Sequence, residues 1–178
     1  MSKRSRGGGS LTGGTGDVNP QFMSFHTVQT GNDAATGGSV QPPVSLSTGE
    51  RLAMEILRVW VETGAPPNAS SSLTFWLSTK NFGTTGPVLG LGDATVLVHD
   101  GWNSTFTTSG VNLLRDVVQY DLTDGAGHGV LVGNQNLYWG INSVTTTATQ
   151  AVNWKILYRA KKISQSELLG IVLQSNQN

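Results

Sequence analysis

Residues 151–163, AVNWKILYRAKKI, carry the clearest structural signal in the chain. Apolar and polar side chains alternate along this segment with a period of two, which is typical of a β-strand with one buried face. The expected buried face carries Val152, Trp154, Ile156, Tyr158 and Ala160. The opposite face carries Asn153, Lys155, Leu157, Arg159 and Lys161. We therefore expect a long strand that packs one side against a core and presents basic side chains on the other.

Shorter segments of the same kind lie upstream, separated by turns rich in glycine, threonine and asparagine. Residues 71–79, SSLTFWLST, alternate most regularly. The complete set of expected strands is 21–30, 52–62, 71–79, 93–99, 111–122, 128–133, 137–144 and 151–163. Eight antiparallel strands without a secure long helix predict an all-β fold of two packed sheets, of which the single jelly-roll sandwich is one form.

The most apolar segment, residues 52–62 (LAMEILRVWVE), is compatible with two structures. Ser47 and Glu50 have the spacing of a helix-capping box, and the apolar positions partly follow a helical period. The run Val59-Trp60-Val61, followed by a stretch of glycine, alanine and two prolines, favours a strand that enters a turn. As a strand, the segment is expected to separate two groups, Leu57, Val59 and Val61 on one face and Met54, Ile56 and Trp60 on the other.

Composition agrees with a strand-rich domain and excludes several kinds of site. The chain has 178 residues, the length of one domain, with 23 glycines and only 12% charged residues. It contains no cysteine, which excludes disulfides, thiolate metal sites and cysteine nucleophiles. No apolar run approaches the roughly 18 residues of a membrane-spanning helix, so we expect no membrane insertion.

The sequence contains no recognisable catalytic or cofactor motif. His26, His99 and His128 are far apart and form none of the usual metal-binding spacings. No serine lies in a GxSxG motif, and the glycine-rich loops lack the lysine of a phosphate-binding loop. We therefore expect no catalytic residue, no metal and no cofactor, and the protein is predicted not to be an enzyme.

Two acidic residues, Asp121 and Asp124, flank Thr123 at the start of a glycine-rich turn. The interpretation that we favour is that both carboxylates cap the turn by accepting backbone hydrogen bonds. The alternative is a surface Ca²⁺ site formed by the two carboxylates and nearby backbone oxygens.

Positive charge is concentrated at the two ends of the chain, in residues 1–10 and 155–178, although the formal net charge is zero. Residues 1–19, MSKRSRGGGSLTGGTGDVN, combine Lys3, Arg4 and Arg6 with many glycines and few apolar residues. Such a segment buries too little surface to offset its ordering entropy, so we predict a flexible basic arm followed by a folded domain at residues 20–178. A mobile basic arm is suited to non-specific contact with nucleic-acid phosphates.

Lys155, Arg159 and Lys161 form a second candidate nucleic-acid-binding group, because they share one face of the expected strand at 151–163. One interpretation is a basic wall directed at a polyanion. The other is an ordinary solvated strand face with no ligand.

Two C-terminal segments resemble a known family. They are DLTDGAGHGVLVGNQNLYWGINS at 121–143 and NWKILYRAKKISQSELLGIVLQSNQ at 153–177. Both are similar to the C-terminal half of capsid proteins from small circular single-stranded DNA viruses that encode a replication initiator, and MEILRVWVE at 54–62 resembles an upstream strand of the same proteins. The resemblance covers residues 50–178. One departure is the N-terminal arm, which has three bases where such capsids often have a long arginine-rich arm.

The resemblance implies a single jelly roll that self-assembles into an icosahedral shell of sixty copies or a multiple, with the protein located in the virion and, during assembly, in the host cell. It implies a single-stranded DNA genome held by non-specific phosphate contacts. The eight expected strands would be jelly-roll strands B to I in chain order. Loops at 31–50, 80–92, 123–127 and 145–150 would lie at one end of the sandwich, and loops at 63–70, 100–110 and 134–136 at the other.

Two other functions remain open on the sequence. A carbohydrate-binding β-sandwich would use exposed Trp76, Trp102 or Trp139 as a stacking platform, but it gives the basic arm no role. A hydrolase would need a triad or carboxylate pair that the sequence does not reveal. The tail after residue 163 is also ambiguous, because Ser164 and Glu167 have capping-box spacing whereas residues 170–173, GIVL, are typical of a strand.

Overall fold

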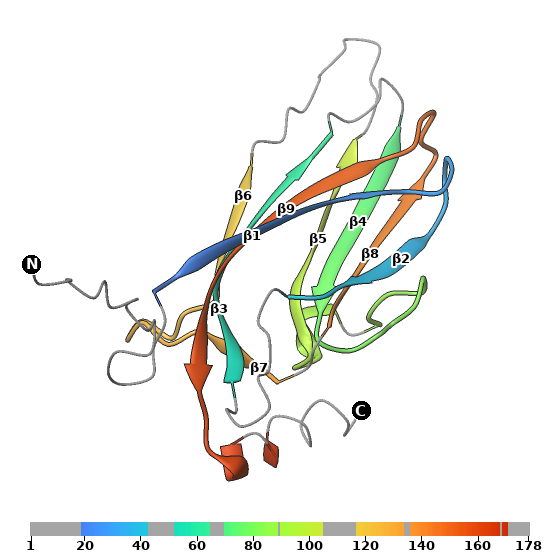
Figure 1. The fold of residues 1–178 in the computed structure, drawn as a ribbon. Helices are drawn as coiled ribbons and strands as arrows, with labels where there is room; N and C mark the ends of the chain where they lie inside the picture. Colours follow the sequence, from blue (N-terminus) through green and yellow to red (C-terminus); the bar gives the residue numbers. More distant parts are fainter. Residues whose placement is uncertain are drawn as a thin grey trace, which may run out of the picture.

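The computed structural model describes residues 19–42, 52–64, 70–88, 90–104, 117–133, 136–167 and 169–170. The strands form two antiparallel sheets that face each other (Figure 1). The first sheet contains β1 (Gln21–Val28), β9 (Ala151–Lys162), β3 (Leu52–Thr63) and β6 (Val118–Asp121) in that order, with β7 (Val130–Val132) also paired to β3. The second sheet has the order β2 (Thr36–Val40), β8 (Leu137–Val144), β4 (Ser71–Ser78) and β5 (Val96–Ser104).

This strand order is that of a jelly roll. The first and last strands pair in the first sheet, and chain neighbours such as β1 and β2, or β3 and β4, lie in opposite sheets. β6 and β7 both pair with β3 and together occupy one strand position, so the described residues fill eight positions. The predicted jelly-roll sandwich is therefore confirmed.

The alternation predicted for the last strand is also confirmed. Val152, Trp154, Ile156 and Tyr158 are buried between the sheets, and their neighbours point outward. Trp154 is the largest buried side chain: it stacks on Phe25 at 5.9 Å, meets Phe75 edge-on at 5.7 Å, and donates its indole N–H to Thr27 Oγ1 at 3.0 Å.

β3 is a strand rather than a helix, but one detail of its prediction is wrong. A β-bulge shifts the register between Ile56 and Arg58. Beyond the bulge the alternation is reversed relative to an unbroken strand. Met54 and Ile56 therefore share the core face with Val59 and Val61, whereas Trp60 points away from the core.

The predicted strand boundaries are wrong in the second sheet. β2 lies inside the expected loop 31–50, and β5 continues to Ser104 through Asp100-Gly101, which was expected to be a turn. Glycines have a packing role in both strands. A Cβ at Gly38 would lie 2.7 Å from the Trp139 ring, and one at Gly101 would lie 2.1 Å from the Leu73 carbonyl oxygen. The jelly-roll letters C to F consequently belong to β2, β3, β4 and β5, and G to β6 with β7; residues 105–116 lie outside the described part.

The expected grouping of loops also needs correction. At one end of the sandwich, Ser71 pairs with Ser104 and Ser72 with Val144, so β5 and β8 end there. β3 ends on the same side, together with the β1–β2 turn (Figure 1). Ser78 pairs with Val96 and Tyr138, which places loop 79–95 at the opposite end (Figure 1). Loops 80–92 and 145–150 were expected at the same end of the sandwich, but they lie at opposite ends, so this part of the predicted grouping is wrong.

The tail begins with the helix-capping box that the sequence suggested. Ser164 N–H donates to Glu167 Oε2 at 2.7 Å, and Glu167 N–H donates to Ser164 Oγ at 3.2 Å. Residues 165–167 and 169–170 are helical. The alternative strand at 170–173 is wrong for Gly170, and its other residues lie outside the described part. No helix in the described ranges has the length and apolar character needed to cross a membrane.

The close approach of β8 to β4 gives a stability prediction. A Cβ at Gly140 would lie 1.9 Å from Trp76, whose side chain is held beneath loop 79–95. Gly140→Ala should therefore reduce the free energy of unfolding by about 1–3 kcal/mol through overpacking, measured by urea titration with circular dichroism. Gly64→Ala is the control, since nothing lies within 4 Å of its Cβ. Equal midpoints for the two variants would contradict this packing.

Candidate nucleic-acid interface

The three basic residues predicted on β9 lie on the outer face of the first sheet, meaning the face directed away from the core. Lys155, Arg159 and Lys161 alternate with the buried side chains of the same strand. Their surroundings nevertheless divide them into two groups. Arg159 and Lys161 contact a buried carboxylate, whereas Lys155 lies beside aromatic rings.

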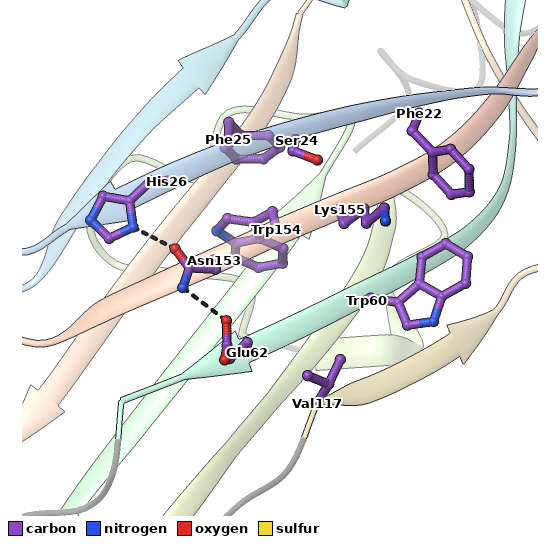
Figure 2. A pocket seen from close by; sticks show the side chains of 10 residues that line it. All are labelled: Phe22, Ser24, Phe25, His26, Trp60, Glu62, Val117, Asn153, Trp154 and Lys155. Carbon is purple, nitrogen blue, oxygen red and sulfur yellow. Dashed lines mark hydrogen bonds between the residues drawn. The ribbon is translucent and has the colours of Figure 1, made fainter.

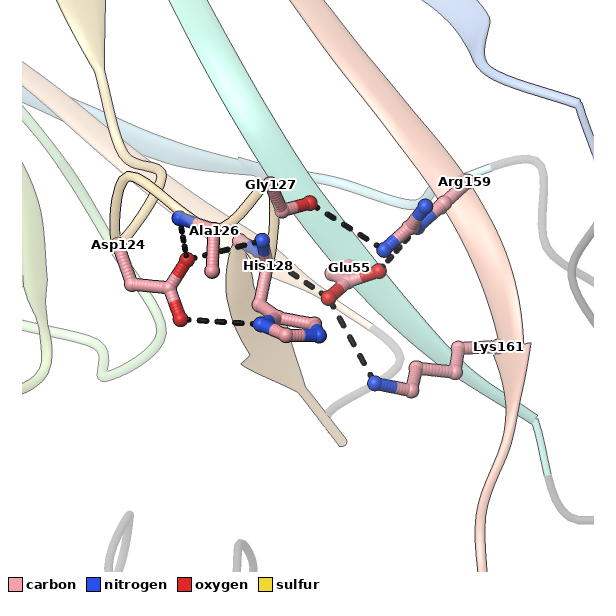
Figure 3. Close-up of polar contacts among 8 residues, drawn as sticks. Glu55, Asp124, Ala126, Gly127, His128, Arg159 and Lys161 are labelled. Atoms are coloured by element: carbon pink, nitrogen blue, oxygen red, sulfur yellow. Dashed lines mark hydrogen bonds and ion pairs between the residues drawn. The ribbon is translucent and has the colours of Figure 1, made fainter.

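The buried carboxylate belongs to Glu55 of β3, which has no exposed surface (Figure 3). Arg159 Nε contacts its Oε2 atom, and Lys161 Nζ lies 3.7 Å from Oε1. The backbone N–H of Gly129 donates to Oε1 at 3.1 Å. Arg159 also donates from Nη2 to the Gly127 carbonyl oxygen at 3.3 Å. The Gly-His-Gly segment thus closes over a charge-paired site.

Glycine at position 129 is required by this geometry. Its Cα approaches β3 so closely that a Cβ would lie 2.1 Å from the Ile56 carbonyl oxygen. This approach directs the Gly129 N–H at Glu55. The two cations could be named from the sequence, but Glu55 could not, since only the register Glu55↔Arg159 brings them together.

Competing effects act on the Glu55 pKa. Burial raises it, because a charged carboxylate is poorly solvated in the protein. The hydrogen bonds from Arg159 and Gly129 and the charges of Lys161 and Arg159 outweigh burial and hold the pKa below its ordinary value. Arg159 and Lys161 therefore stabilise an ionised internal group.

Asp121 and Asp124 act as turn caps, as favoured above. Asp121 accepts hydrogen bonds from Thr123 N–H and Oγ1 at 3.0 and 2.7 Å and pairs with Arg58 at 3.3 Å. Asp124 accepts from Ala126 N–H at 2.8 Å and from His128 N–H at 3.0 Å. Those hydrogen bonds lower both carboxyl pKa values. Within the described ranges, no group of three or more acidic or histidine side chains is arranged for a metal.

Lys155 lies in a groove of about 900 Å³ on the same outer face (Figure 2). Its ammonium group lies 4.6 Å from the centre of the Phe22 ring, a cation–π contact. The Phe22 ring is 5.9 Å from Trp60 at an interplanar angle of 52°, and the Trp60 indole N–H donates to Gln119 Oε1 at 2.9 Å. Phe22 is 58% exposed, so this end of the groove presents aromatic surface beside a cation.

The other end of the groove is polar. His26 Nδ1 and Asn153 Oδ1 are 2.6 Å apart, and Asn153 Nδ2 donates to Glu62 Oε2 at 3.0 Å (Figure 2). These side chains come from three neighbouring strands, β1, β9 and β3. The groove was not expected from the sequence, because its residues converge only through the pairing of those strands.

Other candidate residues are not brought together. Lys3, Arg4 and Arg6 lie outside the described residues. His26, His99 and His128 form no common site in the described part of the chain. Of the tryptophans that the carbohydrate-binding alternative would need exposed, Trp76 is 2% exposed, and Trp102 and Trp139 are partly buried against the core.

The two-sheet fold has counterparts among solved structures. No protein-family model matches the chain, and no curated protein matches its sequence. VP1 of Trichodysplasia spinulosa-associated polyomavirus superposes with a TM-score of 0.53 at 10% identity, covering 84% of this chain and 98% of that one. The fold is shared with polyomavirus VP1.

Further solved structures give the same result. The same VP1 in complex with GM1 oligosaccharide has a TM-score of 0.52 at 10% identity, covering 82% of this chain and 96% of that chain. Merkel cell polyomavirus VP1 in complex with GD1a oligosaccharide superposes with a TM-score of 0.50 at 8% identity, covering 84% of this chain and 97% of that chain. At such low sequence identities, these superpositions show a common fold and nothing further. The virus group suggested by the sequence resemblance differs from this one and stays a prediction.

The Glu55 cluster predicts an acid-sensitive stability. The folded-state pKa is depressed, so the stabilisation from Glu55 is present above the ordinary value of 4.5 and is lost as pH falls through the folded pKa. Glu55→Gln should reduce the free energy of unfolding at pH 7 by about 1–3 kcal/mol, because it leaves two cations without their carboxylate. It should also flatten the loss of stability on the acid side, measured by urea unfolding from pH 7 to 3.

The control for this experiment is Glu62→Gln, an exposed glutamate on the same strand. It should retain the wild-type dependence on pH. If Glu55→Gln kept both the wild-type free energy of unfolding at pH 7 and the wild-type loss of stability between pH 7 and 3, the cluster would contribute nothing to stability.

Proposed function

We propose that this chain is a viral capsid protein that self-assembles into an icosahedral shell around a single-stranded DNA genome. The observation that carries the proposal is the jelly-roll strand order shared with a VP1 structure over 98% of that chain. The C-terminal resemblance to capsid proteins of small single-stranded DNA viruses supports the same role and gives the genome type. The protein would then reside in the virion and, during assembly, in the host cell.

Assembly would depend on weak contacts between subunits that are repeated many times in the shell. A closed shell repeats each contact in every subunit, so individually weak interfaces suffice. Exposed apolar side chains at both ends of the sandwich are suited to such contacts: Val88 is 92% and Leu91 65% exposed in loop 79–95, and Val28 and Val144 are 44% and 55% exposed at the opposite end.

The genome would be held by charge without sequence preference. Lys3, Arg4 and Arg6 near the N-terminus would supply one group of cations, and the outer face of the first sheet would supply Lys155, Arg159 and Lys161. Three cations on one arm bind weakly, but repetition over sixty or more subunits makes the sum large.

A carbohydrate-binding module is the weaker alternative. Its proposed tryptophan platform is buried or partly buried. Several VP1 structures hold oligosaccharides, but at about 10% identity that property belongs to those proteins. Nothing in the described residues favours this alternative over a shell protein.

The first test is negative-stain electron microscopy of the purified, nuclease-treated full chain, with the ratio of absorbance at 260 and 280 nm read on the same sample. We expect uniform spherical particles with a ratio raised by protected nucleic acid. The triple variant Lys3→Ala, Arg4→Ala, Arg6→Ala should form similar particles with a lower ratio, because the arm binds phosphates rather than other subunits. Small species alone at every salt concentration and pH would overturn the capsid proposal.

The three cations of β9 should not contribute equally to DNA binding. Arg159 and Lys161 already hold Glu55, whereas Lys155 makes no ion pair with a carboxylate in the described part of the chain. Lys155→Gln should therefore lower affinity for single-stranded DNA most and reduce the salt slope of log K by about 0.7. Arg159→Gln should lower stability most. Fluorescence anisotropy and urea unfolding measure the two effects, and the reverse ranking would contradict this division.

A further inference from the structure

The groove beside Lys155 has features that a packaging surface does not require. Non-specific contact with phosphates needs only cations. This groove adds an exposed aromatic side chain, Phe22, a half-buried one, Trp60, and an ordered polar cluster within a volume of about 900 Å³, the size of small-ligand pockets (Figure 2). Each of these features matches a different part of a nucleotide.

We propose that the groove binds an unpaired base of a single-stranded nucleic acid, stacked on Trp60 and Phe22, with Lys155 on the adjoining phosphate. The inference rests on the proposed function, because it takes the packaged genome as the source of the strand. It adds a defined base-binding site to what is otherwise a contact of charges alone.

The aromatic end is arranged as a stacking surface. Trp60 points outward because the bulge in β3 precedes it, and its indole N–H is fixed on Gln119 at 2.9 Å. Phe22 lies 5.9 Å away on β1 and is 58% exposed. Base–aromatic stacking is sequence-tolerant, since every base has a π-face.

The cation favours a nucleotide over a neutral ligand. The Lys155 ammonium lies over Phe22 with no carboxylate partner among the described residues, so it is available for an anion. Among the described residues that line the groove, Glu62 is the only carboxylate, and it belongs to the polar end.

The polar end is suited to a base edge. Asn153 is held between His26 and Glu62, and after these contacts it retains one amide hydrogen, while Glu62 retains a carboxylate oxygen. A carboxylate accepts hydrogen bonds from an exocyclic amino group, as of cytosine. A neutral sugar would also stack and hydrogen-bond here, but it would leave Lys155 without a counterion.

The test is a competition between two probes of equal charge, the oligonucleotide dC12 and a 12-mer of abasic deoxyribose phosphate. Both carry different fluorophores, are mixed in equal amounts with the full chain in high salt, and are dialysed to low salt. Size-exclusion chromatography then gives the ratio of the probes that elute with the protein. We expect dC12 to exceed the abasic probe by about tenfold or more, because only dC12 can stack.

Variants separate stacking from charge. Trp60→Ala and Phe22→Ala should each lower the dC12-to-abasic ratio at least fivefold, with Trp60→Leu keeping the apolar volume in case the alanine variant unfolds. Lys155→Gln should lower the bound amount of both probes and keep the ratio. The matched controls are Phe82→Ala and Lys80→Gln, another lysine-over-phenylalanine pair in loop 79–95, with 5.6 Å from the ammonium to the ring centre, and they should change neither quantity.

Equal retention of the two probes by the wild type, or an unchanged ratio in both aromatic variants, would overturn the inference. Binding of GM1 oligosaccharide that Trp60→Ala abolishes, without base-dependent DNA binding, would instead assign the groove to a glycan and also overturn it. Electron microscopy of the eluted fractions keeps the two proposals apart. Particles with a ratio near one would refute the base site alone, and a high ratio with only small species would refute the capsid alone.

Discussion

The hydrogen-bonded position of β9 between β1 and β3 is the constraint on which the rest of the structure depends. It joins residue 21 to residue 158 and residue 52 to residue 162, contacts that span more than a hundred positions of the sequence. Closing such long loops carries an entropic cost that must be met before the contacts stabilise the fold, and β1 cannot join β3 in one sheet before the last strand is available. The core around Trp154 is assembled by that same event.

The chemistry of the outer face follows from this pairing. β9 brings Lys155 beside Phe22 of β1 and Trp60 of β3, and it brings Arg159 beside Glu55. One strand thereby divides its cations between two tasks: Arg159 and Lys161 neutralise an internal carboxylate, and Lys155 remains available at a groove. Charge counted along the sequence overstates the cationic surface, because part of it is committed to the interior.

Period-two alternation predicted β4 and β9 because both strands bury one regular face. It could not predict β2, whose two glycines carry no pattern and instead allow close approach, Gly37 to the Gly83 carbonyl oxygen and Gly38 to the Trp139 ring. The position of the bulge in β3 cannot be identified from the sequence, so Met54 and Trp60 were assigned to the same face although they lie on opposite faces. The candidate cations could be named from the sequence, but Glu55 and the groove depend on register between strands, which alternation does not specify.

The register of β1 with β9 also has a consequence for engineering. Gln21 pairs with Tyr158, four residues before β9 ends, so the chain enters and leaves the described domain on the same side. The β1–β2 turn and the connection between β8 and β9 lie at the far end of those strands. Fusions at either terminus would thus be anchored on one side, while peptides inserted into the distal turns would emerge on the other. The domain therefore offers two attachment sites on opposite sides, one at its chain ends and one at its distal turns.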